Sequence, residues 1–351
     1  MSPRRRTYDE SDVRIRPNRK GSRPRTKDRP RHDDAVDGRV VAVDRGRYTV
    51  LHDGRVVTAM KARELGRKGV VVGDEVGLVG DVAGGPDALA RIVRVHERRS
   101  VLRRTADDTD PVERVIVANA DQLVIVTALA DPPPRPRMLD RCLVAAYDAG
   151  LVPLIVLTKA DLDVDPTGLV EGYSALGAGV LVTSLPNTPT ADDAADDAPD
   201  AARGIEELRA RLSGRVSVFV GHSGVGKSTL VNALVPGAHR ATGDVNDVTG
   251  RGRHTSTSAV ALALPDDDGW IVDTPGVRSF GLAHVAPAQI VTFFPDLEPG
   301  TEECPRGCSH DEVDCALDAW VGSGRAGPGG EARLDSLRRL LRARAGERGG
   351  D

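Results

Sequence analysis

The pattern of hydrophobic and polar positions divides this chain into four parts. Residues 1–35 hold almost no apolar side chains, and residues 36–101 hold short apolar runs broken by turn residues. In residues 102–290, apolar runs of strand length alternate with stretches of helical periodicity. Residues 291–351 are more polar and hold two helical stretches beside a group of cysteines. We therefore expect a disordered basic tail followed by three folded domains with these bounds.

The second part predicts a small β-barrel. Five strand-like runs in about 60 residues, separated by turn signals, are typical of an OB-like or SH3-like barrel. The runs are Val40–Val43, Tyr48–Leu51, Val56–Met60, Glu75–Val79 and Ile92–Val95. Tyr48 is the only aromatic residue there, so a contact with RNA would depend on charge rather than on base stacking. The basic candidates are Arg47, Arg55, Lys61, Arg63, Arg67 and Lys68, and a purely structural barrel is the alternative.

The third part predicts an α/β domain. Strands and helices alternate along it, which gives a parallel sheet whose functional loops lie at the carboxyl ends of the strands. The expected elements are strands at Gln122–Thr127, Pro153–Leu157 and Gly179–Val182, and helices at Pro136–Ala149 and Ile205–Leu212. An Ala/Asp/Pro-rich linker, Asn187 to Asp200, is expected before the second helix.

A phosphate-binding motif follows an apolar strand that ends at Val220. The segment from Gly221 to Ser228 reads G-x-x-x-x-G-K-S and precedes a helical stretch, which is the P-loop in its usual context. We expect Lys227 to reach the β- and γ-phosphates and the Ser228 hydroxyl to bind Mg²⁺. The nucleotide-binding residues expected here are Gly221, His222, Ser223, Gly224, Val225, Gly226, Lys227, Ser228 and Thr229. A glycine-rich turn that binds nothing is the alternative.

Two further motifs indicate GTP. Thr158-Lys159-Ala160-Asp161 follows a strand, and it offers a carboxylate for guanine N1–H and N2 and an apolar lysine stem for the ring. Asp273 ends another strand, where it suits Mg²⁺, and the backbone N–H of Gly276 suits the γ-phosphate. The guanine motif precedes the P-loop, so we expect a circularly permuted GTPase domain. Cutting a parallel sheet at a different loop leaves its loops in the same places.

The fourth part predicts a metal site. The spacing C-x₃-C-x-H-x₄-C is a Cys₃His set suited to one structural zinc ion in tetrahedral geometry, in an α-helical domain. Its ligands would be Cys304, Cys308, His310 and Cys315, and unliganded thiols are the alternative. The last helix, expected at Ala332–Ala345, carries several arginines that would face RNA or solvent.

Together these motifs resemble the ribosome small-subunit-dependent GTPase A family. The order TKAD, TSL, GHSGVGKST, GRGRHTST and DTPGVRSFG, behind a barrel and ahead of the cysteine group, carries the resemblance from about Asp37 to the last helix. It implies a GTPase that binds the 30S ribosomal subunit, assists its late maturation and hydrolyses GTP faster on that subunit. It also implies GTP or GDP, Mg²⁺, zinc and 16S rRNA as ligands or partners, and it adds Thr183 and Ser184 to the GTP-binding residues.

The resemblance also indicates the catalytic group and two departures. Val277 stands where many GTPases carry a water-orienting glutamine, and the family places a histidine in the preceding loop, here His254. A loop histidine without a role is the alternative. One of Thr255, Ser256 or Thr257 would complete the Mg²⁺ shell, and Ser256 is our assignment. Thr158 replaces the usual asparagine, and both zinc-loop spacings are one residue shorter than in the family.

Charge and apolar content predict where the protein is located and leave two competing functions. Residues 1–34 carry a net charge of +6, against −4 for the whole chain, which suits a tail that binds the RNA backbone. No apolar run approaches the roughly 20 residues that span a bilayer, and no apolar core follows the basic N-terminus. We therefore expect a cytoplasmic monomer without a membrane partner. A P-loop kinase or ATPase, and an RNA-binding assembly factor that nucleotide only tunes, are the competing functions.

Overall fold

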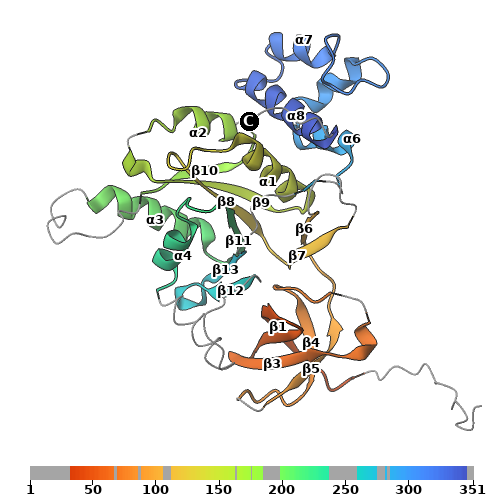
Figure 1. The fold of residues 1–351 in the computed structure, drawn as a ribbon, viewed down its shortest axis with the longest axis vertical. Helices are drawn as coiled ribbons and strands as arrows, with labels where there is room; N and C mark the ends of the chain where they lie inside the picture. Colours follow the sequence, from red (N-terminus) through yellow and green to blue (C-terminus); the bar gives the residue numbers. More distant parts are fainter. Residues whose placement is uncertain are drawn as a thin grey trace, which may run out of the picture. The chain divides into compact units, whose positions relative to one another are not determined.

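The computed structural model describes residues 32–66, 69–85, 88–105, 112–162, 164–174, 176–184, 198–236, 259–274, 281–282 and 285–345. Side chains are described from 204 within the helix that starts at 198, and up to 342 within the last helix. The chain divides into Met1–Asp33 and a compact unit from Asp34 to Asp351, and every element below lies in the second (Figure 1).

The first five strands close into a barrel. They are β1 (Val36–Asp44), β2 (Arg47–His52), β3 (Arg55–Lys61), β4 (Glu75–Gly80) and β5 (Ala90–Val95), with a 3₁₀ turn η2 (Arg63–Leu65) after β3. Each strand pairs with the next in the ring β1-β2-β3-β5-β4, and β4 pairs back with β1. Every second residue points inward, so Val40, Val50, Val57 and Ile92 form a fully buried core. The predicted β-barrel is confirmed, and the pairing of β4 with β1 closes it.

A short hairpin follows the barrel, made of β6 (Val101–Arg104) and β7 (Arg114–Ala118). Gly73 of the barrel approaches this hairpin so closely that a Cβ atom would lie 1.9 Å from the carbonyl oxygen of Ala118. Its φ of +88° also favours glycine. The Asn119 amide donates to the carbonyl oxygen of Gly73 at 2.9 Å, which fixes the backbone at this contact.

The next elements form the predicted α/β sheet. Its strand order is β10 (Gly179–Val182), β9 (Val152–Thr158), β8 (Gln122–Ala128), β11 (Arg215–Gly221), β13 (Gly269–Asp273) and β12 (Val260–Ala263). All neighbouring pairs are parallel except β12 with β13. β12 also pairs with β1 through Val260 and Ala42, so the sheet continues into the barrel.

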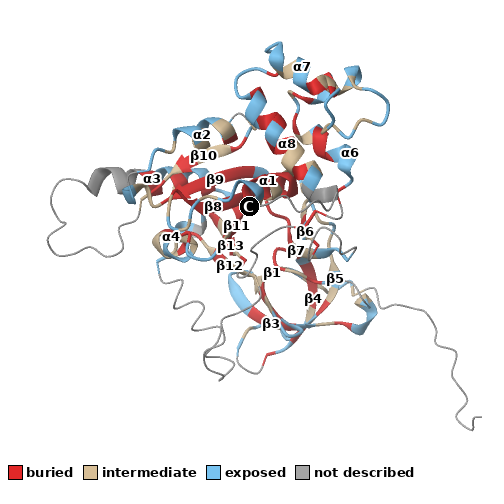
Figure 2. Cartoon of the chain, turned by 45° about the horizontal axis from the view of Figure 1, so that its top comes forward, coloured by how far each residue is buried: buried red, intermediate tan, exposed pale blue. Residues whose placement is uncertain are grey.

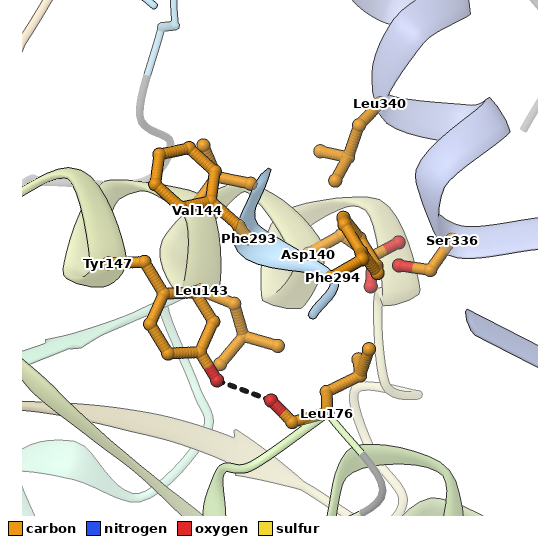
Figure 3. Close-up of a pocket in the computed structure, with 9 residues that line it drawn as sticks. All are labelled: Asp140, Leu143, Val144, Tyr147, Leu176, Phe293, Phe294, Ser336 and Leu340. Carbon is orange, nitrogen blue, oxygen red and sulfur yellow. Dashed lines mark hydrogen bonds between the residues drawn. The ribbon is translucent and has the colours of Figure 1, made fainter. Parts of the chain in front are cut away.

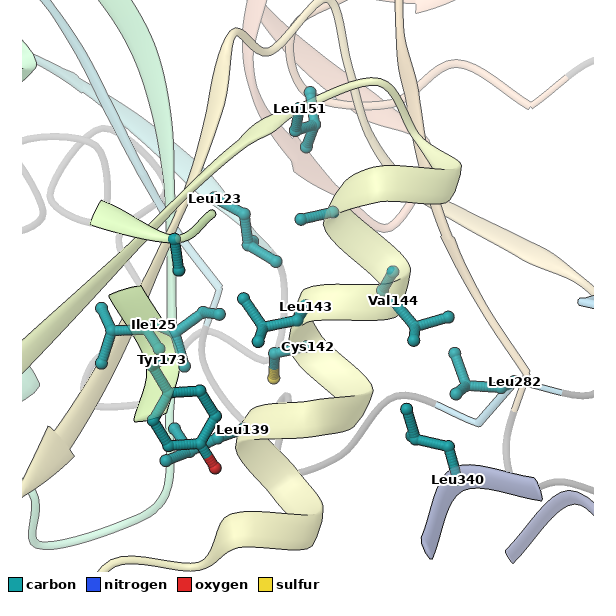
Figure 4. Packing of buried hydrophobic residues seen from close by; sticks show 14 of the residues in the cluster. Leu123, Ile125, Leu139, Cys142, Leu143, Val144, Leu151, Tyr173, Leu282 and Leu340 are labelled. Atoms are coloured by element: carbon teal, nitrogen blue, oxygen red, sulfur yellow. The ribbon is translucent and has the colours of Figure 1, made fainter. Parts of the chain in front are cut away.

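Helices cover both faces of this sheet. They are α1 (Pro136–Asp148), α2 (Thr167–Ser174), α3 (Ala198–Leu212) and α4 (Lys227–Leu234), with 3₁₀ turns η3 (Ala160–Leu162) and η4 (Pro265–Asp267). Leu123 and Ile125 of β8 belong to the core that includes α1, and the alternate residues Val124 and Val126 belong to the core that includes α3 and α4. Figure 4 shows Cys142 of α1 inside the first core, as expected for a small buried residue.

One element differs from the prediction. Helix α3 begins at Ala198, inside the segment interpreted as a linker up to Asp200. Pro199 lies at its second position, where a missing N–H costs nothing. The end of the Ala/Asp/Pro-rich segment therefore belongs to helix α3.

The C-terminal region is helical and irregular. It contains α6 (Pro287–Ile290), η5 (Val291–Phe293), η6 (Glu298–Glu303), α7 (Ala316–Gly322) and α8 (Gly330–Ala345). Leu317 of α7 and Leu337 of α8 are fully buried, and Figure 2 shows one buried side on α8. Among the described helices, none is both long and apolar enough to cross a membrane.

A candidate GTP site and metal site

The P-loop connects β11 to α4, and its glycines are required by geometry. Gly224 and Gly226 have φ values of +84° and +85°, which favour glycine. A Cβ atom on Gly221 would lie 2.6 Å from the carbonyl oxygen of Val126. Val225 points its side chain into the core, so only its backbone faces the loop. The loop therefore presents backbone N–H groups and the start of α4, which suit phosphate.

The Asp273 motif lies beside the P-loop. β13 runs next to β11, and Lys227 Nζ forms an ion pair with Asp273 Oδ1. The two side chains are 14% and 31% exposed, so both remain accessible to a ligand. Thr274, which the sequence motifs did not single out, donates its hydroxyl to the carbonyl oxygen of Phe219 at 2.7 Å. This bond holds the end of β13 against the P-loop strand.

The guanine motif also reaches the P-loop. Thr158 is buried at the end of β9, and its hydroxyl donates to the carbonyl oxygen of Val225 at 2.6 Å. Threonine, which replaces the usual asparagine here, therefore bonds directly to the P-loop. Lys159 has a φ of +60° and donates from Nζ to the carbonyl oxygen of Asp131. Sequence reasoning missed Asp131, whose only signal was the proline-rich loop after β8.

The carboxylate expected to recognise guanine is held by the next strand. Ser184 donates its hydroxyl to Asp161 Oδ1 at 2.8 Å. Thr183 N donates to the carbonyl oxygen of Leu157 at 2.7 Å, and Ala160 N donates to the carbonyl oxygen of Thr183 at 3.3 Å. These bonds place both motifs at neighbouring strand ends, so Ser184 fixes the orientation of the Asp161 carboxylate.

One open cleft brings the guanine motif and the P-loop together. Its volume is about 570 Å³, and its walls come from the guanine motif, from the segment after β10, and from the P-loop and α4. The lining residues are Asp131, Thr158, Lys159, Asp161, Leu162, Thr183, Gly226 and Thr229. Motifs separated by as many as 98 positions in the sequence, from Asp131 to Thr229, thus meet in one place.

Some predicted site residues lie outside the described part of the chain. These are Gly276, His254 and the three Mg²⁺ candidates Thr255, Ser256 and Thr257. Within the P-loop, Ser228 is exposed, and His222 Nδ1 lies 3.0 Å from the carbonyl oxygen of Ser223. In the barrel, Tyr48 is buried and cannot stack on a base, while Arg47, Arg55 and Arg63 are exposed.

A second hollow, of about 220 Å³, lies between α1, η5 and α8 (Figure 3). It is mostly apolar, and the Tyr147 hydroxyl beside it donates to the carbonyl oxygen of Leu176. Asp140 at its edge accepts two hydrogen bonds from Arg339, at 3.1 and 2.9 Å, and one from Tyr173 at 3.3 Å. Burial raises the pKa of Asp140, and Arg339 opposes this rise. The hollow is a packing gap away from the GTP motifs.

The predicted zinc ligands gather in space. Cys304, Cys308, His310 and Cys315 bring their ligand atoms within 4.8 Å of one another. Cys304 Sγ lies 3.6 Å from His310 Nδ1 and 3.9 Å from Cys315 Sγ. Tetrahedral zinc, with bonds of about 2.3 Å to sulfur and about 2.0 Å to nitrogen, requires separations of about 3.5 and about 3.8 Å. The donor set and its spacing fit zinc, so the two shorter loops still close.

Burial sets the protonation of these groups in the absence of a metal. It raises the pKa values of the Cys308 and Cys315 thiols and lowers the pKa of His310. The neutral imidazole is the form that binds metals, whereas the thiols must release their protons to solvent when a metal ion binds.

The arginines of α8 form ion pairs with carboxylates of this chain. Among the described side chains, Arg333 bonds Asp296, Arg338 bonds Asp318, and Arg339 and Arg342 bond carboxylates as well. Each of these guanidinium groups is used inside the C-terminal region or against α1. In the described part of α8 these arginines therefore bind carboxylates of this chain.

Comparisons with known proteins agree with the geometry. Residues 95–283 match the family described as RsgA GTPase. A protein named small ribosomal subunit biogenesis GTPase RsgA, from Chlorobaculum parvum, is 39% identical over 281 residues, which cover 77% of this chain and 85% of that relative. The protein of the same name from Pseudomonas aeruginosa is 38% identical over 265 residues, which cover 73% of this chain and 72% of the relative.

Solved structures agree as well. The crystal structure of YjeQ from Thermotoga maritima superposes with a TM-score of 0.64 at 27% identity, and covers 90% of this chain and 100% of that one. YloQ, described as a circularly permuted GTPase, shares the fold with a TM-score of 0.61 at 22% identity, and covers 92% of this chain and 100% of that one. A circularly permuted GTPase fold behind a β-barrel is thereby established. This chain belongs to the RsgA GTPase family.

Proposed function

We propose that this protein is a GTPase that binds the small (30S) ribosomal subunit and assists its late maturation. It hydrolyses GTP to GDP and phosphate, and the subunit stimulates the reaction. The supporting observation is the single cleft in which Asp161 and the P-loop residues Gly226 and Thr229 face each other. The names of the relatives, whose sequences match most of this chain, supply the ribosomal partner.

The proposed roles follow from the positions of the residues. Asp161, oriented by Ser184, accepts hydrogen bonds from the guanine edge, and the stem of Lys159 covers the ring. Thr158 ties this motif to the P-loop. The remaining GTP contacts are assigned to Ala160, Thr183, the segment Gly221–Thr229, Asp273 and Gly276.

A small set of groups is assigned to stabilise the phosphate charge and to orient the attacking water. Lys227 leaves Asp273 to meet the β- and γ-phosphates, where its charge stabilises the transition state. Bound Mg²⁺, held by Ser228 and Ser256, would neutralise phosphate charge. His254 orients the attacking water, because Val277 has no polar group for this task.

The remaining proposals concern the domains. The OB-like barrel spans 36–101, the GTPase domain 102–290 and a zinc-binding helical domain 291–351, after the basic segment 1–35. Structural zinc is bound by the Cys₃His cluster. The barrel and tail contact 16S rRNA through charge, since Tyr48 is buried. The protein acts as a monomer in the cytoplasm, where its ribosomal partner is found.

GTP turnover with purified 30S subunits present and absent tests this function. We expect slow turnover alone and faster turnover with the subunit, and competition by GDP but not by ADP. Equal competition by ADP would favour an ATPase or kinase. Single-turnover hydrolysis that the subunit leaves unchanged would instead favour a factor that uses nucleotide only to tune binding.

A further inference from the structure

Two arginines of α8 form hydrogen bonds with the segment that carries the candidate metal ligands and with the start of α7. Arg338 Nε donates to the carbonyl oxygen of His310 at 2.9 Å, and its two terminal nitrogens donate to Asp318 at 2.9 and 2.6 Å. Arg342 donates through Nε and Nη2 to the two oxygens of Asp311, both at 2.7 Å. The bonded residues lie 20 to 31 positions apart in the sequence.

The groups that these arginines bond belong to a ligand or lie within three positions of one in the sequence. Arg338 bonds the backbone of the ligand His310 itself, and Asp311 is the next residue. Asp318 lies in the first turn of α7, which begins immediately after the ligand Cys315. A planar guanidinium that makes paired bonds restricts both distance and angle, which a lysine ammonium cannot do. Half of the ligand set is therefore fixed in place by α8.

The charges around the ligands give these arginines a second effect. The ligand segment and the start of α7 carry four carboxylates, Asp311, Glu312, Asp314 and Asp318. A zinc ion with three thiolates and a neutral imidazole adds a net charge of about −1. The two guanidinium groups offset part of this negative charge.

We propose that Arg338 and Arg342 are positioning residues for the metal, so that helix α8 completes a site whose ligands all lie in residues 304–315. The inference rests on the proposed zinc site and deepens it. Arg338 carries the larger share, because its side chain is 18% exposed and bonds a ligand directly, whereas Arg342 is 45% exposed and acts through Asp311.

The test is the Zn²⁺ affinity of the full-length protein, measured by competition with a chromophoric chelator. Arg338→Gln is expected to weaken binding by about 10- to 100-fold, the usual effect of losing a group that orients a ligand, and Arg342→Gln by less. The visible spectrum of the Co²⁺-substituted protein reports the coordination geometry, and we expect weaker tetrahedral bands in Arg338→Gln. Arg211→Gln is the matched control, since it removes an equally charged side chain that pairs with Glu207 on α3.

A rescue variant separates positioning from a general loss of folding. Arg342→Gln leaves Asp311 with only the longer ion pair to Arg338 Nε, at 3.9 Å, so adding Asp311→Asn to it should recover most of the lost affinity. If Arg338→Gln and Arg342→Gln bind Zn²⁺ as tightly as the parent, or if Arg211→Gln weakens binding equally, the inference is wrong. If the parent protein itself does not bind Zn²⁺, the proposed zinc site fails together with it.

Discussion

Replacing Thr158 by valine removes one hydroxyl group and nearly preserves the volume of the side chain. That hydroxyl donates to the carbonyl oxygen of Val225 at 2.6 Å, and the side chain is buried, so water cannot replace the bond. Losing such a bond costs about 1 kcal/mol, and more if the carbonyl oxygen stays unpaired. Because the bond ties the guanine motif to the P-loop, we expect this cost to appear in nucleotide affinity. One kcal/mol corresponds to about a 5-fold rise in Kd.

The assay is a titration of the purified protein with a fluorescent GDP analogue, followed by displacement with unlabelled GDP. Thr158→Ser keeps the hydroxyl and should stay within about 2-fold of the parent. Thr292→Val is the matched control, because it removes a hydroxyl that donates to the carbonyl oxygen of Gln289 at 2.8 Å on the surface. An unchanged Kd for Thr158→Val in a folded protein would refute the idea that this bond assembles the site.

Three further predictions concern catalysis, thiols and pH. His254→Ala should slow turnover on 30S subunits by about 100-fold or more while GTP affinity stays close to that of the parent, and equal turnover would exclude the role of His254. Burial raises the pKa of Cys142 to about 12, so iodoacetamide should spare this thiol in the native protein even after a chelator exposes the metal ligands, as mass spectrometry would reveal. Hydrogen bonds from the arginines of α8 lower the pKa values of Asp311 and Asp318, so the unfolded chain binds these protons first as pH falls. The stability that these two carboxylates contribute is present above about pH 4 and lost below it. Asp311→Asn should therefore reduce the pH dependence of the thermal unfolding midpoint of the metal-free protein below about pH 4.

The barrel illustrates what local pattern can and cannot predict. Alternation of apolar residues indicated its five strands, because side chains of a strand point to opposite faces. The pairing of β3 with β5, and of β4 with β1, depends on which strands meet after collapse. The same limit applies to Tyr48, whose sequence position alone did not reveal that it is buried.

The residue types that define the chemistry of both candidate sites can be read from short stretches of the chain. Glycines that adopt positive φ, a lysine and a serine at fixed spacing, and a Cys₃His set are local requirements, so they can be recognised in a few adjacent residues. The permuted motif order was equally visible, because it is a property of the chain and not of the fold.

Which distant groups contact these motifs depends on how the chain folds. Lys159 donates a hydrogen bond to the carbonyl oxygen of Asp131, and Thr158 donates one to that of Val225. Arg338 donates one to the carbonyl oxygen of His310. No local pattern specifies these partners, because an arginine or a carbonyl group can bond any suitable group that folding brings within about 3 Å. Conformation near a residue is set by its neighbours in sequence, whereas its long-range bonds are set by packing.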